Sequence, residues 1–377
     1  MKRKNNIISK IFVKLLGNEK YQGITIPVFA ILLSLIVGAI VIAILGKDPI
    51  TAYGNLLQGS GIMPKLRYAG GKSMLTDFFS FMNYWTPRIV AALAVAVALK
   101  AGLFNIGISG QMLVAGFISS VVVGYSTLEA PIAKPLVILI SIVVGGIVGA
   151  LIGWLKYKFN INEVVSSIMI NYIIQYVVAF LINTKYVDPV SRQSKNVSDA
   201  ARLTLMDTEI GGYKYDIPLG IILAVIVAFL IRFIFNKTTF GYELKAVGSN
   251  RKAAQYAGIN VGKNMIMGML ISGALSGLAG ATYYLGYFCS MQPKVLAATG
   301  YDSIAVALLG NSNPIGILFS SFLVSVIGKG STYMSSTAGL DAEIASVITG
   351  LILLFSACGA YIQYKVKKAK EKMEVEK

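Results

Sequence analysis

Histidine is absent from this chain of 377 residues, and only two cysteines occur, Cys289 and Cys358. Histidine is the commonest metal ligand and a frequent general base, so its absence argues against both roles. Both cysteines lie in or beside apolar segments, where a thiol behaves as a small hydrophobic group. We therefore expect no metal site, no cofactor and no enzymatic activity.

Charged residues are also scarce, at 14% of the chain against 55% hydrophobic residues. A soluble domain carries about 25% charged residues, so the deficit indicates that lipid is the solvent. Segments 24–45 and 344–364 contain no Asp, Glu, Lys or Arg. Each is long enough as a helix to cross a hydrocarbon core of about 30 Å, and a helix satisfies its own backbone there.

Apolar runs bounded by charges, Pro or Gly predict an all-α polytopic membrane protein with about ten transmembrane helices. The boundaries near 100–110 and 311–315 contain Gly, Asn or Pro, and we expect broken or bent helices at both places. The predicted spans are 24–45, 86–100, 103–124, 135–155, 164–183, 217–235, 264–286, 301–311, 314–330 and 342–364.

Lys and Arg set the expected orientation. They are more than twice as frequent in 1–23, 156–163, 236–263 and 365–377 as in the segments on the other side, so that basic side is cytoplasmic. The expected organisation is a basic cytoplasmic N-terminus at 1–23, a retained first helix at 24–45, an extracytoplasmic loop at 46–85, a core at 86–364 with a cytoplasmic segment at 236–263, and a charged cytoplasmic tail at 365–377.

The net charge of +17 could also indicate a nucleic-acid partner. No basic patch interleaved with aromatic residues lies in a soluble stretch, however, so the charge is assigned to membrane topology and no nucleic acid is expected.

A weak internal repeat predicts a duplicated core. AVAL at 96–99 recurs at 305–308, and the Ile-Gly pair at 106–107 recurs at 315–316 with the same offset. Glu163 and Glu343 begin two further similar stretches, in the same order. Chance similarity between apolar stretches is the alternative, but transporters built from duplicated halves place the substrate path between them.

The stretch Gly102-Leu-Phe-Asn-Ile-Gly-Ile-Ser-Gly-Gln111 places three glycines and two amides between strongly apolar runs. Open backbone of this kind is tolerated at membrane depth only inside protein or beside water. Asn105 and Gln111 offer both donors and acceptors, which suits a neutral ligand in a substrate path. The alternative is that these amides tie helices together.

A second motif, Thr239–Ile259, lies in the longest central cytoplasmic segment and reads TFGYELKAVGSNRKAAQYAGI. Residues 249–257 are predicted to form a short helix with Ser249 or Asn250 as cap and Gly258 as terminator. So short a helix needs a partner surface, and its alanines at 253, 254 and 257 suit a groove on a soluble subunit. The alternative is an ordinary solvated loop.

Other polar and small residues have more modest interpretations. Asn171 and Gln175 share one face of a helix and could line a path or tie helices. Arg88 is assigned to a span end, where it would snorkel. The glycines at 145, 149 and 153 and at 273 and 277 are spaced for close helix packing,.

Gly71-Lys72-Ser73 resembles the end of a phosphate loop, but Leu66 stands where the first glycine is required,. If transport uses ATP, another polypeptide must therefore supply the nucleotide site.

GLFNIGISGQM and GYELKAVGSNRKAAQYAGI, together with Asn162-Glu-Val and Met169-Ile-Asn-Tyr172, resemble the permease subunits of bacterial ABC importers of the ribose, branched-chain amino acid and nucleoside group. The resemblance covers roughly residues 85–365. It is strongest to the longer permease of nucleoside importers, which has an extended outward loop after its first helix.

This resemblance implies a second permease in a heteromeric pair, a cytoplasmic ABC ATPase, an extracytoplasmic substrate-binding lipoprotein and a nucleoside as cargo, all at a bacterial cell membrane. It implies that the substrate path is bordered by five amides: Asn105, Gln111, Asn171, Asn311 and Asn313. It implies coupling to the ATPase through seven residues: Glu243, Gly248, Asn250, Arg251, Ala253, Ala254 and Gly258.

Several other functions are left as alternatives. Sugar permeases of the ribose type share much of the pattern. An ion-coupled transporter would need ionisable relays inside its spans, whereas the candidates here, Glu163, Asp302 and Glu343, lie near predicted span ends. A membrane enzyme lacks a clustered acid–base set, and a self-contained channel would conduct without any ATPase.

Overall fold

The computed structural model describes residues 22–68, 70–341 and 343–375, so most of the expected basic N-terminus at 1–23 lies outside the described residues. The first half of the chain forms α2 (Gln22–Ile44), α3 (Pro49–Gly59), α4 (Met74–Lys100), α5 (Ile108–Ser119), η1 (Ser120–Gly124), α6 (Ala130–Phe159), α7 (Glu163–Leu181), η2 (Ile182–Tyr186) and η3 (Asp199–Ala201). The second half forms β1 (Thr204–Ile210), β2 (Tyr213–Pro218), α8 (Leu219–Lys237), α9 (Thr239–Ser249), α10 (Arg251–Tyr256), α11 (Val261–Thr282), η4 (Tyr283–Tyr287), α12 (Ala298–Leu309), α13 (Pro314–Ala338), α14 (Glu343–Ala357) and α15 (Gly359–Val375).

Among the described residues, seven of the predicted spans are helices long and apolar enough to cross a membrane, namely α2, α4, α6, α7, α8, α11 with η4, and α13. Three shorter apolar helices, at 108–124, 298–309 and 343–352, occupy the positions of the other three. The chain is therefore a multi-pass, mainly helical membrane protein, as the scarcity of charge predicts. The two spans expected to be broken, 103–124 and 301–311, are among the short ones.

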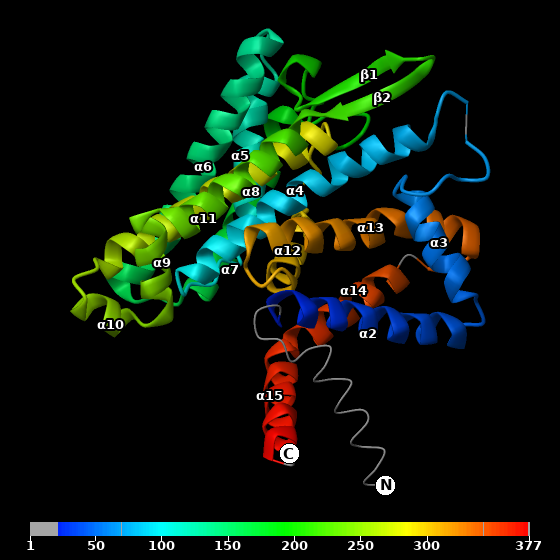
Figure 1. Ribbon diagram of the computed structural model, residues 1–377. Helices are drawn as coiled ribbons and strands as arrows, with labels where there is room; N and C mark the ends of the chain where they lie inside the picture. Colours follow the sequence, from blue (N-terminus) through cyan, green and yellow to red (C-terminus); the bar gives the residue numbers. More distant parts are fainter. Residues whose placement is uncertain (1–21, 69, 342, 376–377) are drawn as a thin grey trace.

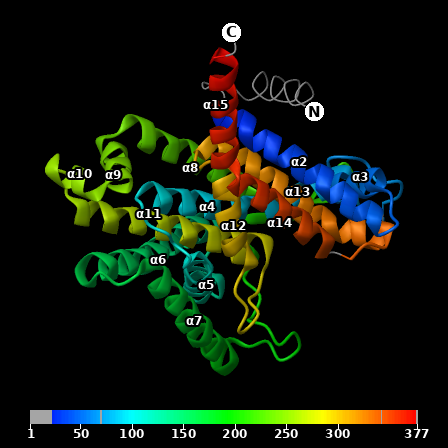
Figure 2. The same ribbon diagram turned by 90° about the horizontal axis from the view of Figure 1, so that it is seen from below.

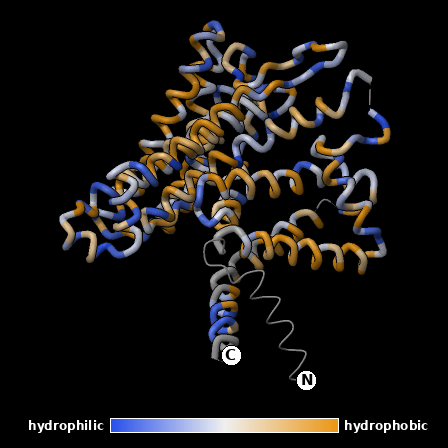
Figure 3. Tube along the Cα trace, in the orientation of Figure 1, coloured by the Kyte–Doolittle hydropathy of each residue, from blue (hydrophilic) through white to orange (hydrophobic). Residues whose placement is uncertain are grey.

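Figure 1 shows α4, α6 and α11 running side by side through the core, with the β1–β2 hairpin near one end and α9 and α10 at the other. Hydrophobic residues follow the long helices, while hydrophilic residues gather at these two ends and along α15 (Figure 3). In the view of Figure 2, α15 projects away from the bundle. This distribution is the one that a lipid solvent selects for a helical bundle.

Glycines bring α6 and α11 into backbone contact, as their spacing predicts. A Cβ atom added at Gly149 would lie 2.2 Å from the Met269 carbonyl oxygen, and one added at Gly145 would lie 2.3 Å from the Gly273 oxygen. Such approaches require residues without a side chain and maximise dispersion contacts between the helices. The α6–α11 glycine seam (Gly145, Gly149, Gly153, Gly273 and Gly277) therefore holds two long helices of the core together.

The predicted loop at 46–85 is more ordered than expected, because it contains α3 and the first twelve residues of α4. Asp48 caps α3 by accepting hydrogen bonds from the backbone of Ile50 and Thr51, and its bond from the Thr51 hydroxyl lowers the pKa of this carboxyl. Ser73 and Thr76 form a capping box that starts α4,. Cap residues in a polar stretch mark these helix starts, whereas hydropathy alone overlooks them.

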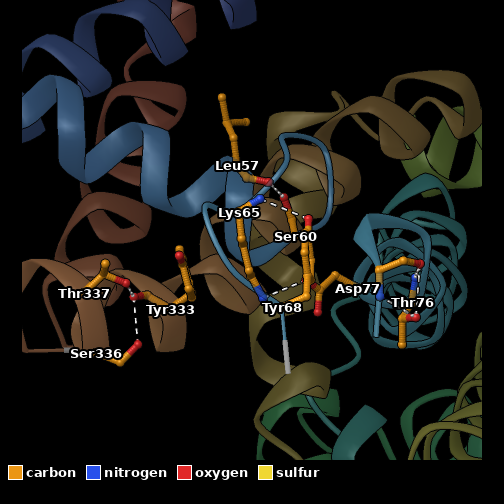
Figure 4. Close-up of polar contacts among 10 residues, drawn as sticks. Leu57, Ser60, Lys65, Tyr68, Thr76, Asp77, Tyr333, Ser336 and Thr337 are labelled. Carbon is orange, nitrogen blue, oxygen red and sulfur yellow. Dashed lines mark hydrogen bonds and ion pairs between the residues drawn. The ribbon is translucent and has the colours of Figure 1, made fainter. Parts of the chain in front are cut away.

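Polar contacts fasten the turn between α3 and α4 to the bundle (Figure 4). Lys65 Nζ lies 2.7 Å from Asp77 Oδ2 and 4.6 Å from the centre of the Tyr333 ring on α13. The Lys65 backbone N–H donates to the Tyr68 hydroxyl at 3.0 Å. Through these contacts Lys65 and Asp77, two charged residues of the predicted loop, have partners within the chain.

The predicted loop at 184–216 also differs, because it carries the antiparallel β1–β2 hairpin. Gly211 and Gly212 form its turn with φ values of +62° and +80°, a conformation that glycine adopts without strain,.

The last predicted span, 342–364, is divided into two helices: α14 ends at Ala357 and the Lys-rich α15 begins at Gly359.

Replacing Gly149 by alanine tests the α6–α11 glycine seam. The added methyl group must push the helices apart, and we expect a loss of about 1–3 kcal/mol in stability, seen as a lower thermal midpoint of the purified protein in detergent. Gly54→Ala is the matched control, since a Cβ atom there meets nothing within 4 Å. Equal midpoints for the two variants would contradict the packing role of the seam.

Candidate functional site

The chain leaves helical conformation after α4 and runs through Ala101–Gly107 before α5 begins at Ile108. Gly102 turns the chain with φ +68°, which glycine permits without strain. The bundle covers most of the stretch, since Ala101, Leu103 and Asn105 are buried, whereas Gly102 is exposed. The expected break in the helical pattern is therefore present, and most of it is covered by protein.

Asn171 on α7 replaces the hydrogen bonds that this break removes. Its Oδ1 accepts from the Gly110 backbone N–H at 3.0 Å, and its Nδ2 donates to the Ile106 carbonyl at 3.0 Å. The same Nδ2 lies 3.5 Å from the Tyr301 hydroxyl on α12. One amide thus satisfies a donor and an acceptor that water cannot reach.

Asn105 and Gln111 complete the same network from within the break and from α5. Asn105 Nδ2 donates to Gln111 Oε1 at 3.0 Å and to the Ser272 hydroxyl on α11 at 2.9 Å. Asn105 Oδ1 accepts from the Gly107 backbone at 2.9 Å. Asn105, Gln111 and Asn171 are 0%, 0% and 1% exposed. In this conformation the three amides tie the broken segment to its neighbours and face no open cavity.

A second non-helical stretch, the one that ends just before α12, contacts the start of α5. The Ser109 hydroxyl donates to the Ala297 carbonyl at 2.9 Å, immediately before α12 begins at Ala298. Asn311 and Asn313 lie beyond the other end of α12. Asn311 turns the chain with φ +53°, and Asn313 caps α13 by accepting from the Ile315 backbone at 3.0 Å. Both are exposed, so the structure does not bring them together with the three buried amides.

The predicted helix at 249–257 corresponds to α10, which follows α9 at the end of the bundle opposite the hairpin (Figure 1). Asn250 caps it by accepting from the Ala253 backbone at 3.1 Å, and Gly258 ends it with φ +81°. Ala253 and Ala257 are exposed. Ala254 is only 4% exposed and packs against the rest of the chain, so the accessible surface of α10 is narrower than the alanine pattern suggests.

Backbone contacts connect the α9–α10 segment directly to the broken stretch. Arg251 Nη2 donates to the Gly102 carbonyl at 3.0 Å. A Cβ atom added at Gly248 would lie 2.2 Å from the Lys100 carbonyl oxygen, so α9 touches the end of α4. Glu243 Oε2 accepts from Asn264 Nδ2 at 2.9 Å, which fastens α9 to α11. A movement of α10 would therefore reach the start of the break without an intervening loop.

The buried Arg88 forms an ion pair with the partly exposed Asp302, a contact that hydropathy did not identify as a site. Arg88 lies midway along α4 at 6% exposure rather than snorkelling at a span end, because α4 begins twelve residues before the predicted span. Its Nη2 lies 3.6 Å from Asp302 Oδ2 on α12, and its guanidinium carbon lies 3.7 Å from the centre of the Tyr84 ring. Ionisable residues inside a membrane bundle are costly to bury and typically functional.

A cavity of about 460 Å³ borders this ion pair, between α4, α12, α13 and α14. Tyr84, Arg88, Asp302 and Glu343 contribute to its walls, together with Ser346 and Thr349. Within residues 22–68, 70–341 and 343–375 no group of three His, Cys, Asp or Glu could hold a metal ion. The groups present can bind a polar ligand through hydrogen bonds and ring contacts.

Asn171→Ala tests the clamp on the broken segment. The Gly110 N–H and Ile106 carbonyl would lose their partner inside the bundle, and we expect a loss of about 2 kcal/mol or more in the stability of the purified protein in detergent. Ile173→Ala on the same helix is the control, since Ile173 is 61% exposed and its truncation should change stability by less than about 0.5 kcal/mol. If both variants unfold at the same temperature, Asn171 does not clamp the segment.

Comparison with known proteins agrees with this architecture. The family model described as branched-chain amino acid transport system, permease component, matches residues 78–357. The guanosine ABC transporter permease protein NupP of Bacillus subtilis is 35% identical over 357 residues, covering 94% of this chain and 99% of that protein. The nucleoside ABC transporter permease protein NupB of Lactococcus lactis is 35% identical over 363 residues, covering 94% and 96%.

The glucose ABC transporter permease protein TsgB13 of Haloferax volcanii is 27% identical over 87% of this chain and 86% of that protein. No solved structure matches the chain. The resemblance drawn from the two sequence motifs is thereby confirmed. The chain belongs to the family of permease components of branched-chain amino acid transport systems, whose members are membrane transport subunits and not enzymes.

Proposed function

We propose that this chain is the permease subunit of an ATP-driven importer of nucleosides. Similarity over nearly the full length of a guanosine permease and a nucleoside permease carries the choice of cargo. Similarity to the glucose permease is lower and covers less of this chain. A sugar importer of the ribose type is therefore the second candidate.

The proposed assembly contains a second permease, a cytoplasmic ABC ATPase and an extracytoplasmic substrate-binding lipoprotein. Shorter nucleoside and guanosine permeases, NupC and NupQ, occur in the same two organisms as NupB and NupP and are 29% and 28% identical to parts of this chain. A heteromeric pair of permeases is consistent with two such forms in one organism.

We place both chain termini and the α9–α10 segment on the cytoplasmic side of a bacterial cell membrane. The higher density of Lys and Arg in 236–263 and in the basic termini favours this orientation,. The β1–β2 hairpin and the α3–α4 turn would then face the substrate-binding protein.

In this proposal α10 docks into a cleft of the ATPase as its coupling helix. Lys252, Ala253, Gln255, Tyr256 and Ala257 form the exposed surface available for docking, and Tyr256 is 94% exposed. Glu243, Gly248, Asn250 and Gly258 shape the segment, and Arg251 passes its movement to Gly102. Closure of the ATPase on ATP would therefore act on the broken stretch through the Arg251–Gly102 hydrogen bond and the approach of Gly248 to Lys100.

The amides of the predicted path have an indirect role in this mechanism. Asn105, Gln111 and Asn171 hold the break in one arrangement by buried hydrogen bonds. Asn311 and Asn313 form the turn that joins α12 to α13. We propose that these residues position the walls of the path, and that the permease moves its cargo by changing shape without covalent chemistry.

Uptake by the complete transporter in proteoliposomes tests this function. We expect entry of labelled guanosine that requires ATP and persists when proton and sodium gradients are collapsed. Entry of glucose or ribose without any nucleoside would replace the proposed cargo by a sugar, and entry that follows an ion gradient would refute ATP coupling.

Ala253→Glu tests the docking surface of α10 in the same assay. The exposed carboxylate should prevent docking, because it must lose its hydration in the cleft, and nucleoside uptake should fall at least about tenfold with a normal amount of protein in the membrane. Ala253→Ser is the matched control and should retain uptake. Ala254 is unsuited to this test, because it is buried and a charge there would disrupt the fold itself. Wild-type uptake by Ala253→Glu would exclude α10 as the coupling helix.

A further inference from the structure

The cavity beside Arg88 and Asp302, here named the α12–α14 chamber, has walls suited to a neutral aromatic ligand. Its volume of about 460 Å³ lies within the range of about 300–1,000 Å³ typical of small-molecule sites. The chamber lies between α4 and α12 on one side and α13 and α14 on the other. It therefore borders the part of the bundle that the coupling segment reaches.

Charges around the chamber are balanced in sign. Arg88 and Lys329 are cationic, and Asp302 and Glu343 are anionic. Lys329 Nζ donates to the Tyr287 hydroxyl at 3.4 Å and lies 5.8 Å from the centre of the Tyr84 ring. A site with this balance has no net attraction for an ion of either sign, so a neutral polar ligand fits it better.

A row of aromatic rings leads from the chamber to a second cavity. The Tyr84 and Tyr287 ring centres are 5.4 Å apart, and those of Tyr287 and Phe288 are 4.7 Å apart. Tyr84 borders the chamber, whereas Tyr283 and Phe288 border a cavity of about 180 Å³ that also touches Gln193 in the loop before β1. Aromatic rings stack on any nucleobase without strong preference, so a base could pass along the row in steps.

Arg88 adds hydrogen-bond donors to the chamber wall. Its Nη1 and Nη2 donate to the Tyr84 carbonyl at 3.2 Å and to the Tyr84 hydroxyl at 2.7 Å. Its Nε–H is buried and has no hydrogen-bond partner among the described residues, so a ligand reaches this N–H only when the side chain turns. A guanidinium group donates and never accepts. Arg88 therefore complements the carbonyl oxygens and ring nitrogens through which nucleobases accept hydrogen bonds.

We infer that the α12–α14 chamber is the nucleoside site of the permease and that Arg88 donates a hydrogen bond to the base. This inference rests on the proposed nucleoside transport. The aromatic row supplies stacking common to all bases, and Ser346 and Thr349 lie in the wall where a ribose could bind.

Arg88→Lys in the complete transporter tests this role of Arg88. Lysine keeps the positive charge beside Asp302 but loses the planar group and its Nε–H. The KM for guanosine should rise about tenfold, as expected for a lost charge-assisted hydrogen bond, whereas kcat should change less than about twofold. An unchanged KM for guanosine would overturn the role of Arg88.

Cysteine accessibility tests the site independently of transport rate. In a chain with Cys289 and Cys358 replaced by serine, Ser346→Cys places a thiol in the chamber wall, and Ser336→Cys places one on the exposed surface of α13 outside it. Guanosine should slow maleimide labelling at position 346 and leave labelling at 336 unchanged. Equal labelling with and without guanosine, in a transporter that still imports it, would overturn the chamber as the site. The wild-type complex is assayed before any variant is made. If it imports no nucleoside, the proposed function itself is refuted.

Discussion

Backbone that leaves helical conformation at membrane depth must find hydrogen-bond partners in protein, because lipid offers none. In this chain the buried amide of Asn171 bonds to both the Ile106 carbonyl and the Gly110 N–H. Asn105 bonds to Gln111 and to Ser272 on α11. Without these bonds the break between α4 and α5 would carry unpaired polar groups, each costing about 1–3 kcal/mol. The packing of α4, α5, α7 and α11 around the break depends on them.

The break also links the two ends of the proposed mechanism. Arg251 on α10 bonds to Gly102 at its start, and Ser109 bonds to Ala297 just before α12. Four residues into α12, Asp302 pairs with Arg88 beside the α12–α14 chamber. The rigid α6–α11 glycine seam lies alongside these contacts and gives them a fixed frame. A displacement of the coupling helix can therefore reach the chamber through contacts of a few ångströms each.

Composition and motif spacing predicted the helical membrane fold, about ten apolar segments, the broken helices and a helix cap at Ser249 or Asn250, of which the structure has Asn250. They could not predict where α4 begins, because Ser73 and Thr76 act through capping in a polar stretch that hydropathy treats as loop. For the same reason Arg88 was assigned to a span end, and its pairing with Asp302 was not predicted. The duplicated core, drawn from two short sequence matches, stays a prediction. Side-chain burial also decides questions that residue type leaves open: Asn105 and Gln111 are equally compatible with a path or a tie until their partners are known.

Hydrogen exchange of the complete transporter in lipid nanodiscs tests the central claim that the ATPase acts on the broken segment. Peptides covering 101–107 should exchange at different rates in the nucleotide-free and ATP-bound states, because docking of α10 moves the chain at Gly102 and strains the amide clamps. Peptides covering the α6–α11 glycine seam should exchange equally in both. Identical exchange of 101–107 in the two states, in a transporter that hydrolyses ATP and imports its substrate, would contradict the mechanism.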